Sequence, residues 1–483
     1  MLVVIFAGIA YAATLPRTVF GLDSAELATG AYTLGIVHSP GAPLYMLLGH
    51  LVCKLPLGDI GCGLNALSAL FGAAGAGLHF LIGLRFTRRV GLAAAAALAV
   101  AFNYYIWAWA IVAELYSLHV LFVLLVTWLL LKGDENGRLV WYGLAGLAWG
   151  LGMGNHTSLV LMLPAYLWLV LGTPRSAVVK FKVLLLAGIG AIAGLMVYLY
   201  FPLRQAASPA LNYVRDYFPD INLATPAGLW WMFRGGMFDA LYFSDSPGNW
   251  IVAWLQHLGQ LASSFTPIGF LVALLGIRLS LQSRDRLSIA IILMWICHTG
   301  FFASYGALDR RWMYSVSYLV VGWWVALGLT WLWDRWPVNV RMGRIWIPIA
   351  VAGILTLMVL NGFRVLDLRR DVSARQYYER IFHILPPRAV FFGFWEQIPI
   401  LEYGQLVYGL RLDIQLANVV FMDDAAVQRL ADQASKEGRP VFASRPLTVK
   451  PDAVWIPVWS DRWAIYRLEY DLQTSICAPE NHP

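Results

Sequence analysis

Long apolar runs separated by short polar turns are the feature that most limits what this chain can fold into. Between Leu2 and Phe363 the sequence contains about eleven such runs, and most approach the roughly 20 residues that a helix needs to cross a bilayer. Charged residues make up only 13% of the 483, whereas about 25% is usual in a soluble domain. Because the bilayer core offers no partners to free backbone groups, these runs are expected to be helical. The sequence therefore predicts a mainly α, polytopic membrane protein with about eleven transmembrane helices.

The first run, Leu2–Leu15, is short for a span, and its Ala10-Tyr11-Ala12 resembles a signal-peptidase site. Both a retained helix and a cleaved signal are therefore open. Either choice leaves the segment that follows it on the same side of the membrane.

The basic residues separate the connecting segments into two groups. Clusters such as Arg85–Arg89 and Arg284–Arg286 recur in every second connection, whereas the alternate connections are longer in total and hold fewer basic residues. Since Lys and Arg concentrate in cytoplasmic loops, the basic connections and the N-terminus are expected inside a bacterial-type inner membrane. The net charge of +7 then indicates topology and not nucleic-acid binding. The polar residues expected to lie outside, where they could build one site, are Asp23, Glu114, His156 and Arg310.

From about Arg364 onward, charges become more frequent and the apolar runs shorten to strand length. Helices at 375–385, 399–408 and 425–437 are expected to alternate with strands at 389–394, 413–420 and 440–444, and strands at 454–459 and 463–469 to form a hairpin across 460–462. This alternation predicts a small α/β domain. The predicted organisation is a membrane domain at 1–363 followed by an extracytoplasmic α/β domain at 364–483.

The densest polar and turn chemistry lies in the first outer loop, Gly21–Tyr45. Glycosyl transfer to a hydroxyl needs a base for the acceptor proton and a group that stabilises the departing phosphate. Asp23 follows the first apolar run directly, at the depth where a lipid-linked substrate would present its head group. Its spacing to Glu26 also fits a capping box on a helix that starts at Ser24. We interpret Asp23 as cap and base together, Glu26 as structural, and His38 as a supporting contact.

Further candidates lie in the other outer loops. Glu114 is the only charge in a turn between two apolar runs, where it is either a plain surface residue or a second acidic site residue. A second acidic residue could bind a divalent metal, a sugar hydroxyl or the acceptor. His156 lies in a tight turn and is a candidate for a phosphate or sugar contact. Three arginines could bind the lipid phosphate: Arg204, Arg310 and Arg311. The alternative is that Arg310 and Arg311 belong to a salt-bridge cluster on the surface.

The long loop 202–250 contains an aromatic stripe: Trp230, Trp231, Phe233, Phe238, Tyr242 and Phe243. Such a stripe is more typical of an amphipathic segment on the membrane surface than of a sugar-stacking surface.

Several stretches together resemble a known family. LDSAELATGAYTLGIVHSPGAPLYMLLG (22–49) with NALSAL (65–70) resembles the first-loop signature of the membrane family that includes the animal protein O-mannosyltransferases. AELYSL, GNHTSL and, in the tail, EYGQLVYGLRLDIQLAN also resemble family motifs. The family is similar to the GT-C superfamily. The resemblance implies Asp23 as the catalytic acidic residue, with Glu26, His38 and Glu114 nearby, a polyprenyl-phosphate sugar donor, and an inverting transfer outside the cytoplasm.

The predicted function is an integral membrane hexosyltransferase, O-mannosyltransferase-like, that moves a sugar from a polyprenyl-phosphate-linked donor to a protein hydroxyl or to a glycan or lipid. The chain has no P-loop, HExxH, GxSxG or CxxC motif, so donor energy has to arrive with an activated substrate. One alternative is a transporter or flippase of lipid-linked glycans, which would place charges at mid-membrane depth and broken helices in repeated halves. Another is a membrane scaffold that displays the α/β tail.

Overall fold

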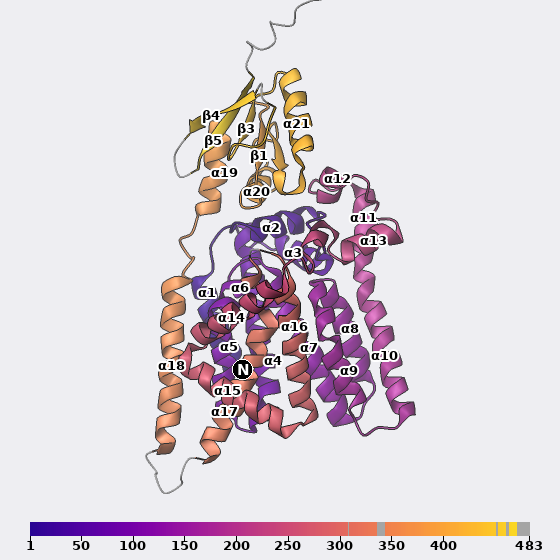
Figure 1. The fold of residues 1–483 in the computed structure, drawn as a ribbon, viewed down its shortest axis with the longest axis vertical. Coiled ribbons are helices and arrows are strands. Elements are labelled where there is room, and N and C mark those ends of the chain that lie inside the picture. The colour runs from indigo at the N-terminus through magenta and orange to yellow at the C-terminus, as the bar shows by residue number, and fades with distance from the viewer. Residues whose placement is uncertain (308, 336–342, 451–452, 460–462, 471–483) are drawn as a thin grey trace, which may run out of the picture.

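The structure is a computed structural model that describes residues 1–307, 309–335, 343–450, 453–459 and 463–470. Its long helices stand side by side in a bundle, and a small α/β domain lies at one end of that bundle (Figure 1). Among the described residues, seven helices are long and apolar enough to cross a membrane. They are α4 (Ile60–Thr87), α7 (Leu115–Asn136), α10 (Ala177–Leu195, continuing to 207), α15 (Thr266–Ser283), α16 (Arg286–Ser304), α17 (Ser315–Arg335) and α18 (Gly343–Val365).

Shorter and broken helices account for the rest of the predicted spans. α1 (Leu2–Thr14) is about 20 Å long, which is less than the hydrocarbon thickness. α8 (Val140–Met153) and the pair η1 (Thr157–Met162) and α9 (Leu163–Leu171) are also short. Length and composition therefore establish seven spans, or eight with the bent pair described next, and not the full predicted number.

Two of the apolar runs are interrupted, so that each contributes to two helices and not to one straight helix. The run 90–112 forms α5 (Val90–Ala101) and α6 (Tyr104–Ala110), bent by 68°. The side chain of Asn103 starts α6 by accepting a hydrogen bond from the N–H of Tyr105 at 3.0 Å. The run 251–277 is split between α14 (Pro247–Ser264) and α15, and Pro267 occupies the first turn of α15, where its missing N–H costs no hydrogen bond.

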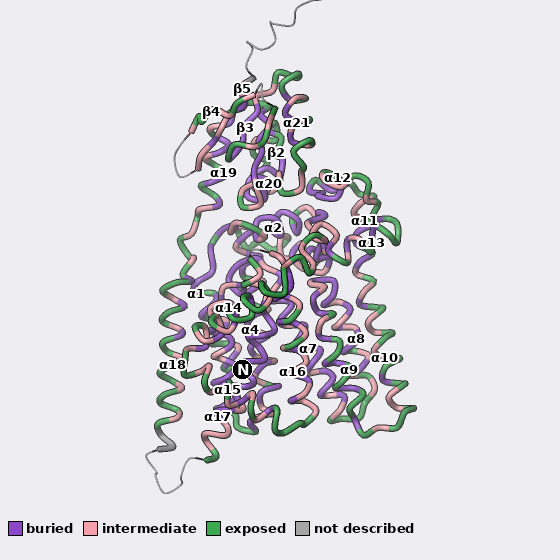
Figure 2. The backbone as a smooth tube through the Cα atoms, in the orientation of Figure 1, coloured by how far each residue is buried: buried purple, intermediate pink, exposed green. Residues whose placement is uncertain are grey.

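Burial separates the bundle into a centre and a periphery. α7 and α17 are mostly buried, whereas α10 and α18 expose most of their side chains at the sides of the bundle (Figure 2). α10 packs closely on α8 through small residues: a Cβ atom on Gly146 would lie 1.9 Å from the carbonyl oxygen of Ala187, and one on Gly150 would lie 2.2 Å from that of Ala191. Close backbone approach of this kind is how helices pack in lipid, where apolar side chains gain little from leaving the solvent.

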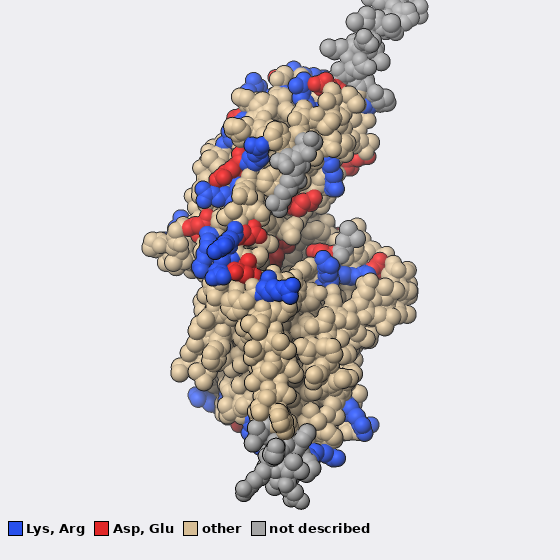
Figure 3. Space-filling model, turned by 90° about the vertical axis from the view of Figure 1, so that its left-hand side faces the viewer, with Lys and Arg blue, Asp and Glu red and all other residues tan. Residues whose placement is uncertain are grey.

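Charged side chains avoid the middle of the molecule. In the side view, a belt without Lys, Arg, Asp or Glu covers much of the bundle, basic residues lie at its lower end, and both signs of charge cover the α/β domain and its junction (Figure 3). An apolar belt between two charged ends is what a bilayer requires. The protein is therefore an integral membrane protein.

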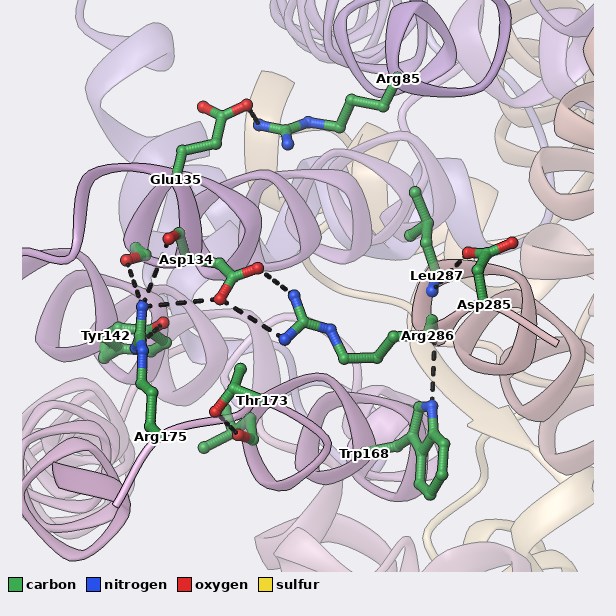
Figure 4. Close-up of polar contacts among 12 residues, drawn as sticks. Arg85, Asp134, Glu135, Tyr142, Trp168, Thr173, Arg175, Asp285, Arg286 and Leu287 are labelled. Carbon is green, nitrogen blue, oxygen red and sulfur yellow. Dashed lines mark hydrogen bonds and ion pairs between the residues drawn. The ribbon is translucent and has the colours of Figure 1, made fainter. Parts of the chain in front are cut away.

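The end of the bundle opposite the α/β domain is tied together by Asp134, near the end of α7 (Figure 4). Its carboxylate pairs with Arg286 at the start of α16 and lies 3.5 Å from the guanidinium of Arg175. Arg175 also donates to the hydroxyl of Tyr142 and, at 3.1 Å, to the carbonyl of Gly133. One partly buried carboxylate thus joins α7, α16 and the segment before α10.

The α/β domain confirms the predicted alternation of elements. It contains α19 (Ser373–Ile384), β1 (Val390–Gly393), α20 (Ile398–Tyr408), β2 (Gln415–Asn418), η5 (Val419–Phe421), α21 (Asp424–Lys436), β3 (Val441–Ala443), β4 (Ala453–Trp459) and β5 (Ile465–Tyr470). The sheet order is β2-β1-β3-β5-β4, in which β1 pairs in parallel with β2 and β3, and β5 pairs antiparallel with β3 and β4. The hairpin turn predicted at 460–462, and residues 471–483 of the predicted domain, lie outside the described residues.

Short helices lie between the bundle and the α/β domain. α2 (Asp23–Thr33) and α3 (Pro43–Cys53) lie across the end of the bundle, and α20 packs on α2 (Figure 1). The predicted loop 202–250 is folded into α11 (Tyr200–Ala207), α12 (Tyr213–Tyr217), α13 (Pro226–Phe233) and η3 (Gly236–Leu241). Hydrogen bonds that join the two parts include Tyr213 Oη to Glu402 at 2.6 Å, Asn418 N to Tyr217 Oη at 2.8 Å, Gly61 N to Tyr403 Oη at 3.1 Å, and Tyr408 Oη to Asp59 at 2.8 Å.

Replacing Asp134 by Asn should destabilise the bundle by about 1–2 kcal/mol, because two partly buried guanidinium groups lose their common partner. The apparent Tm of the detergent-solubilised protein measures this loss. Glu135→Gln is the matched control, since Glu135 pairs with Arg85 and Lys132 but is 43% exposed. It should change stability by less than about 0.5 kcal/mol. Equal losses in the two variants would contradict the structural role of Asp134.

Candidate active site

A cavity of about 770 Å³ lies where the bundle meets the α/β domain. Aromatic and aliphatic side chains form most of its wall, and a few polar groups converge on it, as is usual for a small-molecule site. These polar groups come from α2, the 34–42 loop, the turns before α7 and η1, the segment after α13, and the turn before α17. The charged and titratable residues among them, tyrosines aside, are Asp23, His38, Glu114, His156, Arg234 and Asp309.

Asp23 is the first residue of α2, and the predicted capping box is wrong. The N-cap position is Leu22, and no side chain caps the helix. The carboxylate of Asp23 instead accepts a hydrogen bond of 2.6 Å from the indole N–H of Trp395 in the α/β domain. Its place in the first helical turn is one where the helix dipole favours a negative charge.

Glu26 is fully buried behind His38 and does not line the cavity. One of its oxygens accepts the backbone N–H of His38 at 2.6 Å, and the other lies 2.5 Å from His38 Nδ1. Burial alone would lower the pKa of His38, but the charge of Glu26, the hydrogen bond to it, and the charges of Asp23 and Glu114 together raise this pKa to about 9. The structure therefore places a cationic imidazole at the cavity wall.

Glu114 caps α7, and its carboxylate accepts the N–H of Leu115 at 3.2 Å. Burial, followed by the negative charge of Asp23, raises the pKa of Glu114 well above its ordinary value. The charge of Asp23 therefore favours the protonated form of Glu114 across the cavity.

His156 lines the cavity and caps η1, where its Nδ1 lies 2.7 Å from the hydroxyl of Ser158. Burial and the charge of His38 lower the pKa of His156 to about 4. His156 is therefore a neutral hydrogen-bonding group at pH 7.

None of the three predicted phosphate-binding arginines lines the cavity. Arg204 donates to the carbonyls of Leu34, at 2.7 Å, and Thr33, at 3.3 Å, and so satisfies the end of α2. Arg310 pairs with Asp245 and donates to the carbonyl of Tyr305 at 3.1 Å. Arg311 lies over the ring of Trp312, 5.9 Å from its centroid.

Three lining residues were not among the sequence predictions. Arg234 lies in the aromatic stripe and pairs with Asp239 at 2.7 Å. The stripe itself supplied the signal, because four of its members face the cavity: Trp230, Phe233, Phe238 and Tyr242. Asp309 stands in the charge group from which Arg310 and Arg311 were chosen. Trp395 carried no sequence signal.

Asp23, Glu114 and Asp309 line the cavity and are all possible metal ligands. Within the part of the chain that the structure describes, no three His, Cys, Asp or Glu residues are grouped closely enough to hold a metal ion.

Part of the chain that contains these residues is similar to known proteins. Residues 23–179 match the family model described as the protein O-mannosyl-transferase TMEM260 N-terminal domain. Over 216 residues the chain is 33% identical to the protein O-mannosyl-transferase TMEM260 of Mus musculus. The matched region is 43% of this chain and 31% of the mouse protein, so the chain spans about a third of the length of that relative.

Two solved structures share the fold over most of this chain. One is ArnT from Cupriavidus metallidurans bound to undecaprenyl phosphate, with a TM-score of 0.60, 14% identity and 97% of each chain covered. The other is the oligosaccharyltransferase of Archaeoglobus fulgidus, with a TM-score of 0.56, 13% identity, and 92% of this chain and 69% of that chain covered. Residues 23–179 are thus homologous to the N-terminal domain of the TMEM260 protein O-mannosyl-transferases, and the chain has the GT-C-like fold.

Proposed function

We propose that this protein is a membrane glycosyltransferase that moves a hexose, such as mannose, from a polyprenyl-phosphate-linked donor to a hydroxyl acceptor, with inversion. The observation that carries the proposal is the meeting of Asp23, His38 and Glu114 in one cavity at the junction of bundle and α/β domain. The name of the mouse relative supports sugar transfer to protein, and ArnT, which shares the fold, was solved bound to undecaprenyl phosphate. The basic residues of the opposite end support an extracytoplasmic cavity in a bacterial-type inner membrane, with the N-terminus inside.

In this proposal the two carboxylates have different roles. Asp23 accepts the proton of the acceptor hydroxyl as that oxygen attacks the anomeric carbon, and the bond to the lipid phosphate breaks on the opposite face. Glu114, which the charge of Asp23 helps to keep protonated, donates a hydrogen bond to a sugar hydroxyl. Glu114 is assigned the donor role because burial and the charge of Asp23 raise its pKa, which favours the protonated acid.

The departing polyprenyl phosphate is an anion, and its negative charge grows as the bond breaks. His38 is the cation that we assign to it: Nδ1 is engaged by Glu26, which leaves Nε2 as the donor toward the phosphate. Arg234, although paired with Asp239, is the second cation on the cavity wall. Glu26 then orients His38, and His156 is a neutral hydrogen-bonding contact for the sugar.

We propose that the acceptor is a protein hydroxyl. Transfer to a glycan or lipid hydroxyl instead would correct this assignment of the acceptor. A transporter or flippase of lipid-linked glycans is not favoured. It would need broken helices in two repeated halves, whereas among the described residues α5 and α6 form the one bent pair that passes as a span.

Asp23→Asn should lower kcat for sugar transfer by about 10²–10⁴-fold, because the neutral amide cannot accept the acceptor proton. The assay uses purified protein in liposomes, polyprenyl-phosphate mannose and Ser/Thr-rich peptides, with products detected by mass spectrometry. Asp216→Asn is the control, since Asp216 pairs with Arg215 outside the cavity. Full activity of Asp23→Asn at unchanged expression and Tm would refute the proposed base.

Glu114→Gln should lower kcat by only about 10-fold, since an amide replaces the hydrogen-bond donor of a protonated acid. Glu114→Ala should lose more than the Gln variant in the same assay. If Glu114→Gln were as inactive as Asp23→Asn, the assignment of separate roles would be wrong.

Turnover should fall as pH rises through about 9, because His38 loses the proton that stabilises the departing phosphate. Glu26→Gln should move this alkaline limb to lower pH, since the charge of Glu26 helps to raise the pKa of His38. His38→Gln should be slow at every pH and lack the limb. A wild-type profile that stays flat from pH 7 to 10 would contradict the role of His38.

The same proton also contributes to folding. Because the pKa of His38 is raised above its ordinary value of 6.5, its stabilising effect is complete below about pH 6.5 and is lost as pH rises through about 9. The drop in Tm across this window should therefore be smaller in His38→Gln than in the wild type.

A further inference from the structure

The α/β domain reaches the proposed base directly. Trp395 lies between β1 and α20, 372 residues away from Asp23 along the chain, and its indole N–H donates to Oδ1 of Asp23 at 2.6 Å. Trp395 and Val420 are the residues of the α/β domain that line the cavity. We propose that Trp395 is a positioning residue for Asp23, so that docking of the α/β domain completes the site; this rests on the function proposed above.

The indole ring is itself held from three sides. Its centroid lies 5.2 Å from the ring of His38, 6.0 Å from Tyr213 on α12 and 5.5 Å from Phe421 in η5, each in an edge-to-face arrangement. Behind the ring, the Gln397 side chain accepts the N–H of Phe394 at 3.0 Å and fixes the turn that carries Trp395. A ring held in this way presents its N–H in one direction.

The donor type suits a base. A carboxylate turns about its last side-chain bond, and a hydrogen bond on Oδ1 stops that rotation while Oδ2 stays able to accept a proton. An indole N–H is a donor only and carries no charge. It therefore orients Asp23 without forming the ion pair through which an arginine would compete for the carboxylate.

The Trp395–Asp23 hydrogen bond depends on how the α/β domain packs on the short helices below it. On α20, Glu402 is half-buried and accepts the hydroxyl of Tyr213 at 2.6 Å, and Tyr213 also touches the ring of Trp395. Tyr213 does not line the cavity. Loosening the Tyr213–Glu402 contact should therefore affect the reaction only through the placement of Trp395 and Asp23.

Trp395→Phe, which keeps a ring but removes the N–H, is expected to lower kcat about 10–100-fold and to leave KM for polyprenyl-phosphate mannose within about 3-fold. Tyr213→Phe should show the same split with a smaller loss of about 3–10-fold. The matched control is Trp455→Phe in β4, which removes an indole hydrogen bond of 2.9 Å to the carbonyl of Leu447 away from the cavity. It should keep wild-type kcat.

A kcat of Trp395→Phe within 3-fold of wild type would overturn the proposal, as would a change confined to KM or an equal loss in Trp455→Phe. If Trp395→Phe does not fold, benzothienylalanine at position 395 decides the question, since it replaces the N–H by sulfur at nearly the same volume. The result for Asp23→Asn separates the two hypotheses. An active Asp23→Asn ends the proposed base, whereas an inactive Asp23→Asn with a fully active Trp395→Phe ends only the positioning role.

Discussion

The buried contact between Glu26 and His38 is the interaction on which the site depends. A carboxylate without solvent is costly unless it is paired and hydrogen-bonded, and Glu26 has both the backbone N–H and the ring of His38 as partners. The contact ties α2 to the loop that follows it and so fixes α2 across the end of the bundle. Asp23 then stands at one end of α2 beside the cavity, Arg204 satisfies the carbonyls at the other end, and α20 packs along the helix. Each of these placements would be lost if α2 were free to turn.

A membrane bundle also explains why the polar groups gather where they do. Charged side chains are costly at mid-bilayer depth, so the reactive groups lie at helix ends and in turns: Asp23 begins α2, Glu114 caps α7, and His156 caps η1. Helix starts suit carboxylates because the free N–H groups and the dipole favour negative charge there. In this cavity that rule brings several acids together, and burial together with the charge of Asp23 raises the pKa of Glu114. The different roles proposed for Asp23 and Glu114 follow from this close placement of acids in a buried cavity and require no further residue.

Sequence reasoning succeeded wherever a pattern had one physical cause. Apolar length predicted seven or eight of the spans, and the short apolar runs of the tail predicted the elements of the α/β domain. The distribution of basic residues put Asp23, Glu114 and His156 on one side of the membrane, and these three line one cavity, whereas Arg310, predicted with them, does not. It was wrong where the outcome depended on tertiary partners. The spacing of Asp23 and Glu26 fits a capping box, but Trp395 and His38 engage these carboxylates instead. Arg204 and Arg310 were predicted to compete for the lipid phosphate, with a salt-bridge cluster as the alternative, and in the structure Arg204 binds backbone carbonyls and Arg310 pairs with Asp245. Nothing local in the sequence could reveal partners about 170 and 370 residues away.

Some of the cavity residues lie inside the region that the family model matches, and others lie outside it. Residues 23–179 contain Asp23, Glu26, His38, Glu114 and His156, which is to say every group assigned above to the proton or the sugar, and His38 for the phosphate. Arg234, Asp309 and Trp395 lie beyond the match, as do most of the aromatic side chains of the wall. The chemistry of transfer needs fixed geometry around the anomeric carbon, whereas the acceptor requires only that its hydroxyl reach Asp23. Within the proposed function, the groups that act on the proton and the sugar therefore lie inside the region that the family model matches, whereas the proposed positioning contact from Trp395 lies outside it.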